Sequence, residues 1–232
     1  MPEVIQYAGL SRAGVAVARP LRPWIIDLST IQPCEGMQAG DVHDFEALPD
    51  MGSWTLGDTP DDPALRLQWV RVHDGDKTLL ICDRVLLMRV SWDDLDATGL
   101  VEGRTVVVDG RRHVCRLLTG GSRFRRVDAP TEGGDPADNE WDRHVCAQAG
   151  LPGLIAPSVA DLRGTPSAED RLSQHNQVWN WFGAHSWTRD PYELRPTARC
   201  CRGFWSAGFF YLNTRSHRHE DIGWRPVLEA QD

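Results

Sequence analysis

The dipeptide Asp109-Gly110 restricts the fold of this chain more than any other feature of its sequence. It lies between two apolar-rich runs, Thr105–Val108 and His113–Leu118. Aspartate and glycine both accept the positive φ angles of a two-residue type I′ turn, so Asp-Gly between such runs predicts an antiparallel hairpin. We therefore expect an antiparallel sheet near the middle of the chain.

A second turn signal predicts a similar hairpin earlier in the sequence. Asp74-Gly75 separates Leu65–Val72, in which apolar and polar residues alternate, from the apolar run Thr78–Cys82. Val85–Val90 is a further apolar run. These three segments are expected to be consecutive antiparallel strands.

Helix start signals occur at three places. Ser91 with Asp94 has the spacing of a capping box and predicts a short helix after Ser91. A second helix is expected over Asn139–Ala149, with Asp138 as its N-cap, and a third over Ala168–Trp181. Because the helices are separated from the hairpins along the chain, the fold class is expected to be α+β.

The two ends of the chain show less regularity. Residues 1–64 are rich in proline and glycine and are expected to form an N-terminal arm or cap, with one possible strand at Trp24–Leu28. Residues 65–232 are expected to form one domain. After Gly183 the chain is aromatic and lacks helical periodicity, and its clearest strand candidates are Gly208–Leu212 and Gly223–Leu228.

Composition narrows the possible functions. The chain of 232 residues has a formal net charge of −8, so we do not expect it to bind nucleic acid, although Arg111 to Arg126 contains a local arginine cluster. No apolar run approaches the roughly 20 residues of a membrane span, and we recognise no signal peptide. Synthesis in the cytoplasm is therefore expected, with the six cysteines reduced and Cys82 and Cys115 buried as small apolar residues.

Three stretches, in order, resemble motifs of the formylglycine-generating-enzyme superfamily, which shares the C-type-lectin fold. They are Arg116-Leu117-Leu118-Thr119, Asn139-Glu140-Trp141-Asp142 and Gly223-Trp224-Arg225-Pro226-Val227-Leu228. The resemblance covers about residues 105–230. It implies a C-type-lectin-like fold with short antiparallel strands, one or two helices and a long irregular insert. It also implies that His113–Leu118 and the segment around Trp224 share one sheet, against which the Trp141 helix packs.

Other family motifs are missing, and their absence argues against catalysis. The enzymes carry an Arg-Gly-Gly-Ser-Trp segment ahead of two active-site cysteines a few residues apart, whereas the only close pair here is Cys200-Cys201. Adjacent residues on an extended chain point to opposite faces, so these two thiols cannot easily hold one metal ion. The calcium motifs of the sugar-binding lectins, Glu-Pro-Asn and Trp-Asn-Asp, do not occur in a suitable place. We expect no catalytic residue and no cofactor.

The segment from Trp187 to His219 holds the densest set of aromatic residues and arginines. Such residues dominate protein-binding hot spots, so we expect one exposed recognition face here, with about half of the rings filling the core instead. The segment also resembles the variable region of proteins diversified by retroelements, which implies a phage-, surface- or defence-associated receptor with a macromolecular, protein partner. The candidate ligand-binding residues are Trp187, Tyr192, Arg202, Phe204, Trp205, Phe209, Phe210, Tyr211, Asn213, His217 and His219.

Two further hypotheses stay open. His217 and His219 would share a face of a strand, as a metal site requires, with Glu220, Asp221 or the Cys200-Cys201 pair as further ligands. The arginines of the same segment would repel a cation, so we expect no metal. An oxidase of the formylglycine-generating type, using Cys200 or Cys201, and a structural subunit that closes a homo-oligomer are the alternatives to a binding module.

Overall fold

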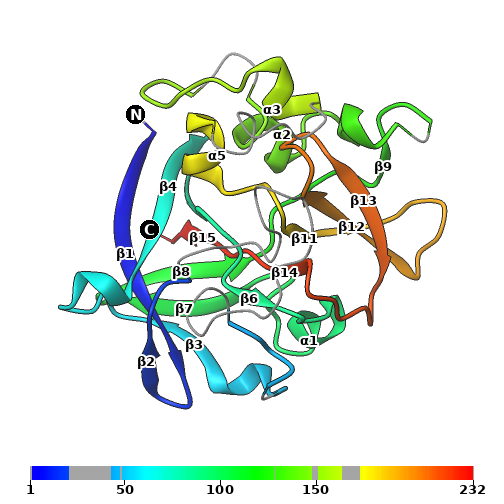
Figure 1. The fold of residues 1–232 in the computed structure, drawn as a ribbon. Coiled ribbons are helices and arrows are strands. Elements are labelled where there is room, and N and C mark those ends of the chain that lie inside the picture. Colours follow the sequence, from blue (N-terminus) through cyan, green and yellow to red (C-terminus); the bar gives the residue numbers. More distant parts are fainter. Residues whose placement is uncertain are drawn as a thin grey trace.

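A computed structural model describes residues 2–20, 43–47, 49–127, 129–147, 151–163 and 173–231. Strands dominate these residues and the helices are short, which is consistent with the expected α+β class. In this part of the chain no helix is long and apolar enough to cross a membrane. Most strands belong to one large and one smaller sheet (Figure 1).

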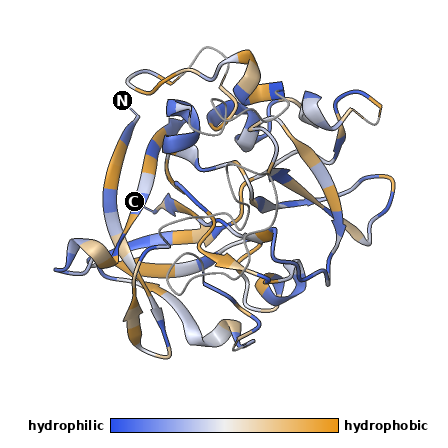
Figure 2. Ribbon diagram, viewed as in Figure 1, coloured by the Kyte–Doolittle hydropathy of each residue, from blue (hydrophilic) through white to orange (hydrophobic). Residues whose placement is uncertain are grey.

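The larger sheet is antiparallel in every pairing. Its strand order is β2-β1-β4-β5-β15-β8-β7, and β3 pairs with β1 off this path. Hydrophobic and hydrophilic residues alternate along its strand β4, which buries one set of side chains (Figure 2). The strands are β1 (Glu3–Arg12), β2 (Val15–Val17), β3 (Trp54–Gly57), β4 (Arg66–Asp74), β5 (Lys77–Cys82), β7 (Arg104–Val108), β8 (Arg111–Arg116) and β15 (Val227–Ala230).

Both predicted hairpins are confirmed. β7 and β8 are joined by Asp109 and Gly110, whose φ angles of 50° and 73° are both positive, as a type I′ turn requires. β4 and β5 pair from Trp69↔Cys82 to Asp74↔Lys77 across the second turn. Turn chemistry therefore determines the register of these two strand pairs, and β15 joins them.

The expectation of an irregular arm over residues 1–64 is wrong for the start of the chain. β1 is ten residues long and pairs with β4 from Glu3↔Arg71 to Gly9↔Arg66. Its register shifts between Gln6 and Gly9, and Ala8 has a φ of 59°, so the alternation that would have revealed the strand is interrupted. The expected strand Trp24–Leu28 lies outside the described residues.

The smaller sheet has the order β13-β12-β11-β14-β6. Its β11–β14 pair is parallel and the others are antiparallel. β13 is an edge strand, which Figure 1 shows at the outer side of the molecule. The strands are β6 (Leu87–Met88), β11 (His185–Pro191), β12 (Ala198–Gly203), β13 (Phe210–Thr214) and β14 (Ile222–Trp224), and a separate two-stranded ribbon joins β9 (Arg123–Phe124) to β10 (Gly134–Asp135).

Two segments leave the larger sheet, contrary to expectation. Of Val85–Val90 only the β6 residues are a strand, and they pair with β14 in the smaller sheet. The predicted strand Gly223–Leu228 divides at Pro226, which has no N–H to donate. The expectation of one sheet for β8 and the C-terminal segment is therefore correct from Val227 onward and wrong for Trp224.

The four described helices are α1 (Trp92–Asp96), α2 (Glu140–His144), α3 (Val159–Arg163) and α5 (Gln174–Trp179). The predicted capping box of Ser91 and Asp94 is confirmed in α1. α2 is shorter than predicted and is capped by Asn139 rather than Asp138. α5 lies within the predicted third helix, whose first residues lie outside the described part. Figure 1 shows α2, α3 and α5 together at one end of the molecule and α1 apart from them.

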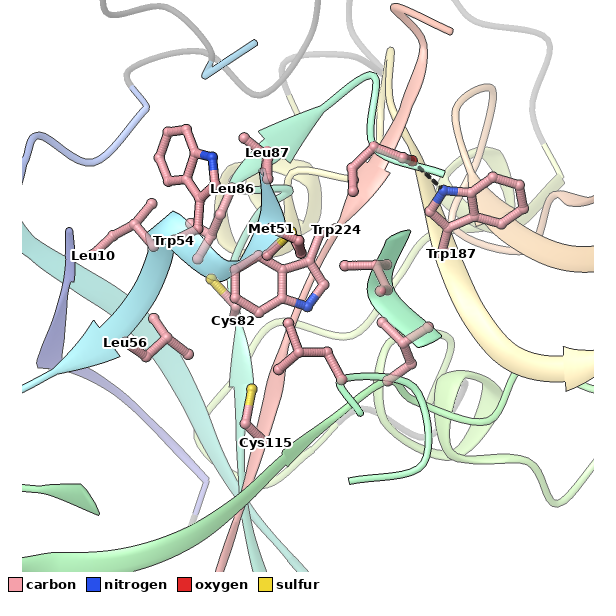
Figure 3. Close-up of a cluster of buried hydrophobic side chains, with 14 of the residues drawn as sticks. Leu10, Met51, Trp54, Leu56, Cys82, Leu86, Leu87, Cys115, Trp187 and Trp224 are labelled. Carbon is pink, nitrogen blue, oxygen red and sulfur yellow. Dashed lines mark hydrogen bonds between the residues drawn. The ribbon is translucent and has the colours of Figure 1, made fainter. Parts of the chain in front are cut away.

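Most tryptophans belong to the core, as expected. One cluster between the two sheets contains Trp54, Trp187 and Trp224 (Figure 3). A second cluster packs Trp141 of α2 against β4, β5 and Val227, which confirms that the Trp141 helix covers the larger sheet. The buried tryptophans among the described residues are Trp54, Trp69, Trp92, Trp141, Trp179, Trp181, Trp187 and Trp224.

Candidate ligand-binding site

Buried ion pairs fix α2 between the two sheets. Arg116 of β8 donates to both carboxylate oxygens of Glu140, at 2.8 and 2.6 Å. Arg202 of β12, which is fully buried, pairs with Asp142 at 2.7 Å. Burial by itself would raise the pKa of both carboxyls, but the adjacent guanidinium groups hold the pKa of Glu140 and of Asp142 below their usual values. Both pairs are therefore charged parts of the framework.

The expectation of one exposed face is wrong for four of the candidate residues, because Trp187, Arg202, Phe204 and Phe210 are buried. Trp187 is buried and donates its Nε1–H to the Val90 carbonyl at 2.8 Å (Figure 3). Arg202 and Phe210, which oppose each other on β12 and β13, are also buried. Successive side chains on a strand alternate between its faces, so an aromatic-rich strand cannot present all of its rings to solvent.

Five rings form one cluster at the end of the smaller sheet. We define the aromatic cluster as His185, Phe204, Trp205, Phe209 and Tyr211. The His185 ring is stacked on Phe204, with centroids 4.7 Å apart, and on Tyr211, at 5.5 Å. Trp205 meets Phe204 edge-on at 4.7 Å, and Phe209 lies 6.1 Å from Tyr211. Tyr211 is 46% exposed, so the cluster extends from the interior to the surface.

His185 forms the buried centre of this cluster. Its exposed fraction is 4%, and burial lowers its pKa to about 4, so the imidazole is neutral at physiological pH. The Nδ1 atom has no hydrogen-bond partner among the described residues. The ring therefore acts mainly as a flat stacking surface for Phe204 and Tyr211.

The backbone at Phe204 is strained. Its φ of 93° lies in a region that bulky residues rarely adopt. Two hydrogen bonds hold it there: the Phe204 amide donates to the Trp181 carbonyl at 2.7 Å, and the Gly183 amide donates to the Phe204 carbonyl at 2.8 Å. Such strain costs about 1–3 kcal/mol and is concentrated at functional sites. At this end of the sheet the Phe204 ring keeps its stack on His185 although the Phe204 backbone is strained.

The remaining candidates are Asn213, His217, His219 and Tyr192. Asn213 follows Tyr211 by two residues on β13 and so shares its face, and its Nδ2 lies 3.8 Å from Cys201 Sγ. His217 and His219 lie in the turn between β13 and β14, with parallel rings 5.6 Å apart. Tyr192 is placed apart from these residues because its ring contacts Phe124.

Sequence reasoning missed His185 and left Asp221 out of the candidate set. A signal for His185 was present, since it precedes Trp187 by two residues on the same strand and so shares its face. Asp221 Oδ1 contacts His219 Nδ1 at 2.8 Å. Within the predicted arginine cluster, Arg123 and Arg125 are ion-paired with Asp135 and Asp142.

The thiols of the smaller sheet are poorly suited to chemistry. Cys200 and Cys201 are buried, and burial raises the pKa of both thiols well above the usual value. They are free, as are the other described cysteines, and Cys34 lies outside the described residues. This end of the sheet instead carries aromatic rings, the Asn213 amide and the imidazoles of His217 and His219, which are groups suited to recognition.

No family model, curated protein or solved structure matches the chain.

Proposed function

We propose that the chain is a non-catalytic binding module with a C-type-lectin-like scaffold, which recognises a protein partner through the aromatic cluster and the adjacent Asn213, His217 and His219. The observation that carries this proposal is the stack of Phe204, His185 and Tyr211 at an open sheet edge. Tyr211 is 46% exposed although its ring stacks on His185. A ring that is held rigidly and is still accessible loses little entropy on binding.

The energetics of such a site depend on few residues. Tyrosine and tryptophan at the centre of an interface contribute about 2 kcal/mol or more each when truncation to alanine is measured. Tyr211 stacks on His185 and carries a polar hydroxyl, so it can fill a pocket of the partner and also form a hydrogen bond. The surrounding Asn213 and His217 are half-buried and supply hydrogen-bonding groups at the rim.

Contacts between the motif stretches support the lectin-fold part of the proposal. The Arg116 stretch meets the Glu140 stretch through their ion pair, and the Glu140 amide donates to Thr119 Oγ1 at 2.8 Å. The third stretch contributes Arg225, which is buried and donates to the carbonyls of Trp179 and Asn180 at 2.6 and 2.9 Å. The residues that carry the resemblance are thus structural in this chain, and the candidate site lies elsewhere.

The oxidase alternative is less well supported. Thiol chemistry uses the thiolate, and the raised pKa values of Cys200 and Cys201 disfavour it. Both residues are also buried within β12, one strand in from the edge. A substrate would have to displace packed side chains to reach either sulfur.

Site-specific photo-cross-linking tests the proposal. We would replace Tyr211 with p-benzoylphenylalanine, irradiate cells that produce the protein, and identify the adducts by mass spectrometry. The matched control carries the same group at Val107, which is 53% exposed on β7 of the larger sheet. The proposal expects one predominant protein adduct from position 211 that position 107 does not give.

The other outcomes are equally informative. An adduct at twice the chain mass from position 211 would favour the structural subunit, with β13 pairing to a second copy. Equal adduct patterns at both positions, or no adduct from position 211, would contradict a recognition site on this face.

A further inference from the structure

We propose that His217, His219 and Asp221 bind a divalent transition-metal ion such as Zn²⁺. The inference shares His217 and His219 with the proposed recognition site, but it is argued only from the geometry and charge of the turn between β13 and β14. In this turn each of the three side chains offers one ligand atom, and the three atoms lie within 4.8 Å of one another. Zinc bonds of about 2.0–2.1 Å at tetrahedral angles place ligand atoms roughly 3.3 Å apart. The side chains therefore need to close by about 1.5 Å at most, which rotamer adjustment supplies.

The backbone of the turn is fixed, so the ligands are already held close together. The His217 amide donates to the Thr214 carbonyl at 3.0 Å, and the Ile222 amide donates to the His219 carbonyl at 3.3 Å. The Asp221 carbonyl accepts the His185 amide at 2.6 Å, which attaches the turn to β11. The two imidazole rings are parallel within 9°. Pre-organisation of this kind lowers the cost of ordering ligands around a metal.

The sequence argument against a cation does not apply to the folded chain. It relied on repulsion by arginines, and the two that flank the histidines, Arg215 and Arg218, are each paired with a carboxylate. Arg218 donates to both oxygens of Asp94, at 2.9 and 2.7 Å, and Arg215 pairs with Asp93. These carboxylates lie in α1, so the guanidinium groups are held toward that helix.

The remaining charge in the turn favours a cation. Glu220 is paired with Arg89 at 2.9 Å. Among the described residues Asp221 is ion-paired with no arginine, and its contact is with His219 Nδ1 at 2.8 Å. That carboxylate can ligate the metal directly or orient the His219 ring so that Nε2 faces it, an arrangement common in zinc sites. Either way the site presents neutral nitrogen donors together with one negative oxygen.

The donor set selects the class of ion. Imidazole nitrogens suit zinc, nickel, copper and cobalt, whereas calcium and magnesium require oxygen ligands. With Asp221 bound directly, the three protein ligands leave a fourth tetrahedral position for water or for a group from another molecule. The site is half-exposed, so an ion can enter from solvent without rearrangement of the fold.

Zinc titration of tag-free protein tests the inference. We expect isothermal titration calorimetry to give one Zn²⁺ per chain for the wild-type protein. His217→Asn, His219→Asn and Asp221→Asn should each weaken binding at least about tenfold. His73→Asn is the matched control, because His73 is an exposed histidine on the larger sheet, and it should bind zinc like the wild type.

Cobalt spectroscopy gives a second readout that does not depend on any variant. Co²⁺ added to the wild-type protein should give the visible bands of a low-symmetry nitrogen and oxygen site without a sulfur charge-transfer band. Zinc should displace the ion and remove those bands. A wild-type protein that binds no zinc, variants that bind it like the wild type, or a sulfur charge-transfer band would each overturn the inference.

Discussion

The two sheets of this chain differ in their strand pairing and in where their backbone is irregular. The larger sheet is wholly antiparallel, and it contains two hairpins with defined turns, one on each side of β15. The smaller sheet contains a parallel pair, a strained residue at Phe204 and an open edge at β13. The larger sheet departs from regular geometry at the β1 bulge, where Ala8 has a φ of 59°, and the smaller sheet departs from it beside the aromatic cluster. Under our proposal the larger sheet serves as scaffold and the end of the smaller sheet as the recognition site.

The two sheets also differ in what holds them. Apolar side chains fill the centre of the larger sheet, including Leu79, Ile81 and Leu228. Arg116 of the larger sheet is 5% exposed, whereas Arg202 of the smaller sheet and Arg225, which follows β14, are 0% and 1% exposed. Burial lowers the pKa of Arg225 to about 10, and the group compensates by donating to backbone carbonyls. A network of directed hydrogen bonds can hold an irregular segment in one conformation, which apolar packing alone would not specify.

Thiol labelling should show the largest difference between native and unfolded chain. Burial raises the pKa of Cys82 and of Cys115 to about 12, so both thiolates are scarce as well as inaccessible. We expect both to react at least about a thousandfold more slowly than in the unfolded chain, because only opening of the domain exposes them. Cys200 and Cys201 are also buried, with raised thiol pKa values, and should be protected in the same way. Peptide-level mass spectrometry after timed alkylation measures all four rates, and native rates equal to unfolded ones would contradict the burial.

Removal of a single buried charge should show how far the smaller sheet depends on its ion pairs. Asp142→Asn leaves the fully buried Arg202 without its counter-ion and should lower the free energy of unfolding by about 3–5 kcal/mol. Asp135→Asn is the control, because its partner Arg123 is exposed and solvent screens the pair, and it should cost much less stability than Asp142→Asn. Urea unfolding followed by tryptophan fluorescence gives both values. Equal losses for the two variants would show that burial of the Arg202 pair is not what fixes α2.

Acidification should weaken the same pairs more gradually. The folded-state pKa values of Glu140 and Asp142 are depressed, so their contribution to stability is complete above the unfolded-state values and is lost as the pH falls through the folded-state values. We expect the free energy of unfolding to start falling below about pH 5. Glu140→Gln should flatten this slope, because one of the two carboxylates no longer titrates. A slope identical to that of the wild type would mean that Glu140 is not held ionised by Arg116.

Sequence reasoning located the parts of the fold that local chemistry determines. Asp109-Gly110 predicted a hairpin and Ser91 with Asp94 predicted a capping box, because a turn and a cap depend on neighbouring residues alone. It missed β1, where a bulge interrupts alternation, and it joined β14 to β15 although Pro226, which has no N–H to donate, marks the division. The site was predicted as a segment, but the buried Trp187, Arg202 and Phe210 could not be separated from Tyr211. That separation requires knowing which face of the smaller sheet is covered.

Tyr211→Ala provides the most direct test of the claim that the aromatic cluster is a recognition site. The measurement is the affinity of the purified variant for the partner identified by cross-linking, by calorimetry, with Tyr192→Ala as a matched control whose ring packs on Phe124. We predict that Tyr211→Ala weakens binding by about 2 kcal/mol, roughly thirtyfold, while its unfolding free energy stays within about 1 kcal/mol of the wild type. Tyr192→Ala should bind like the wild type. Unchanged affinity of the Tyr211→Ala protein, or a loss of binding explained by its unfolding, would contradict the account.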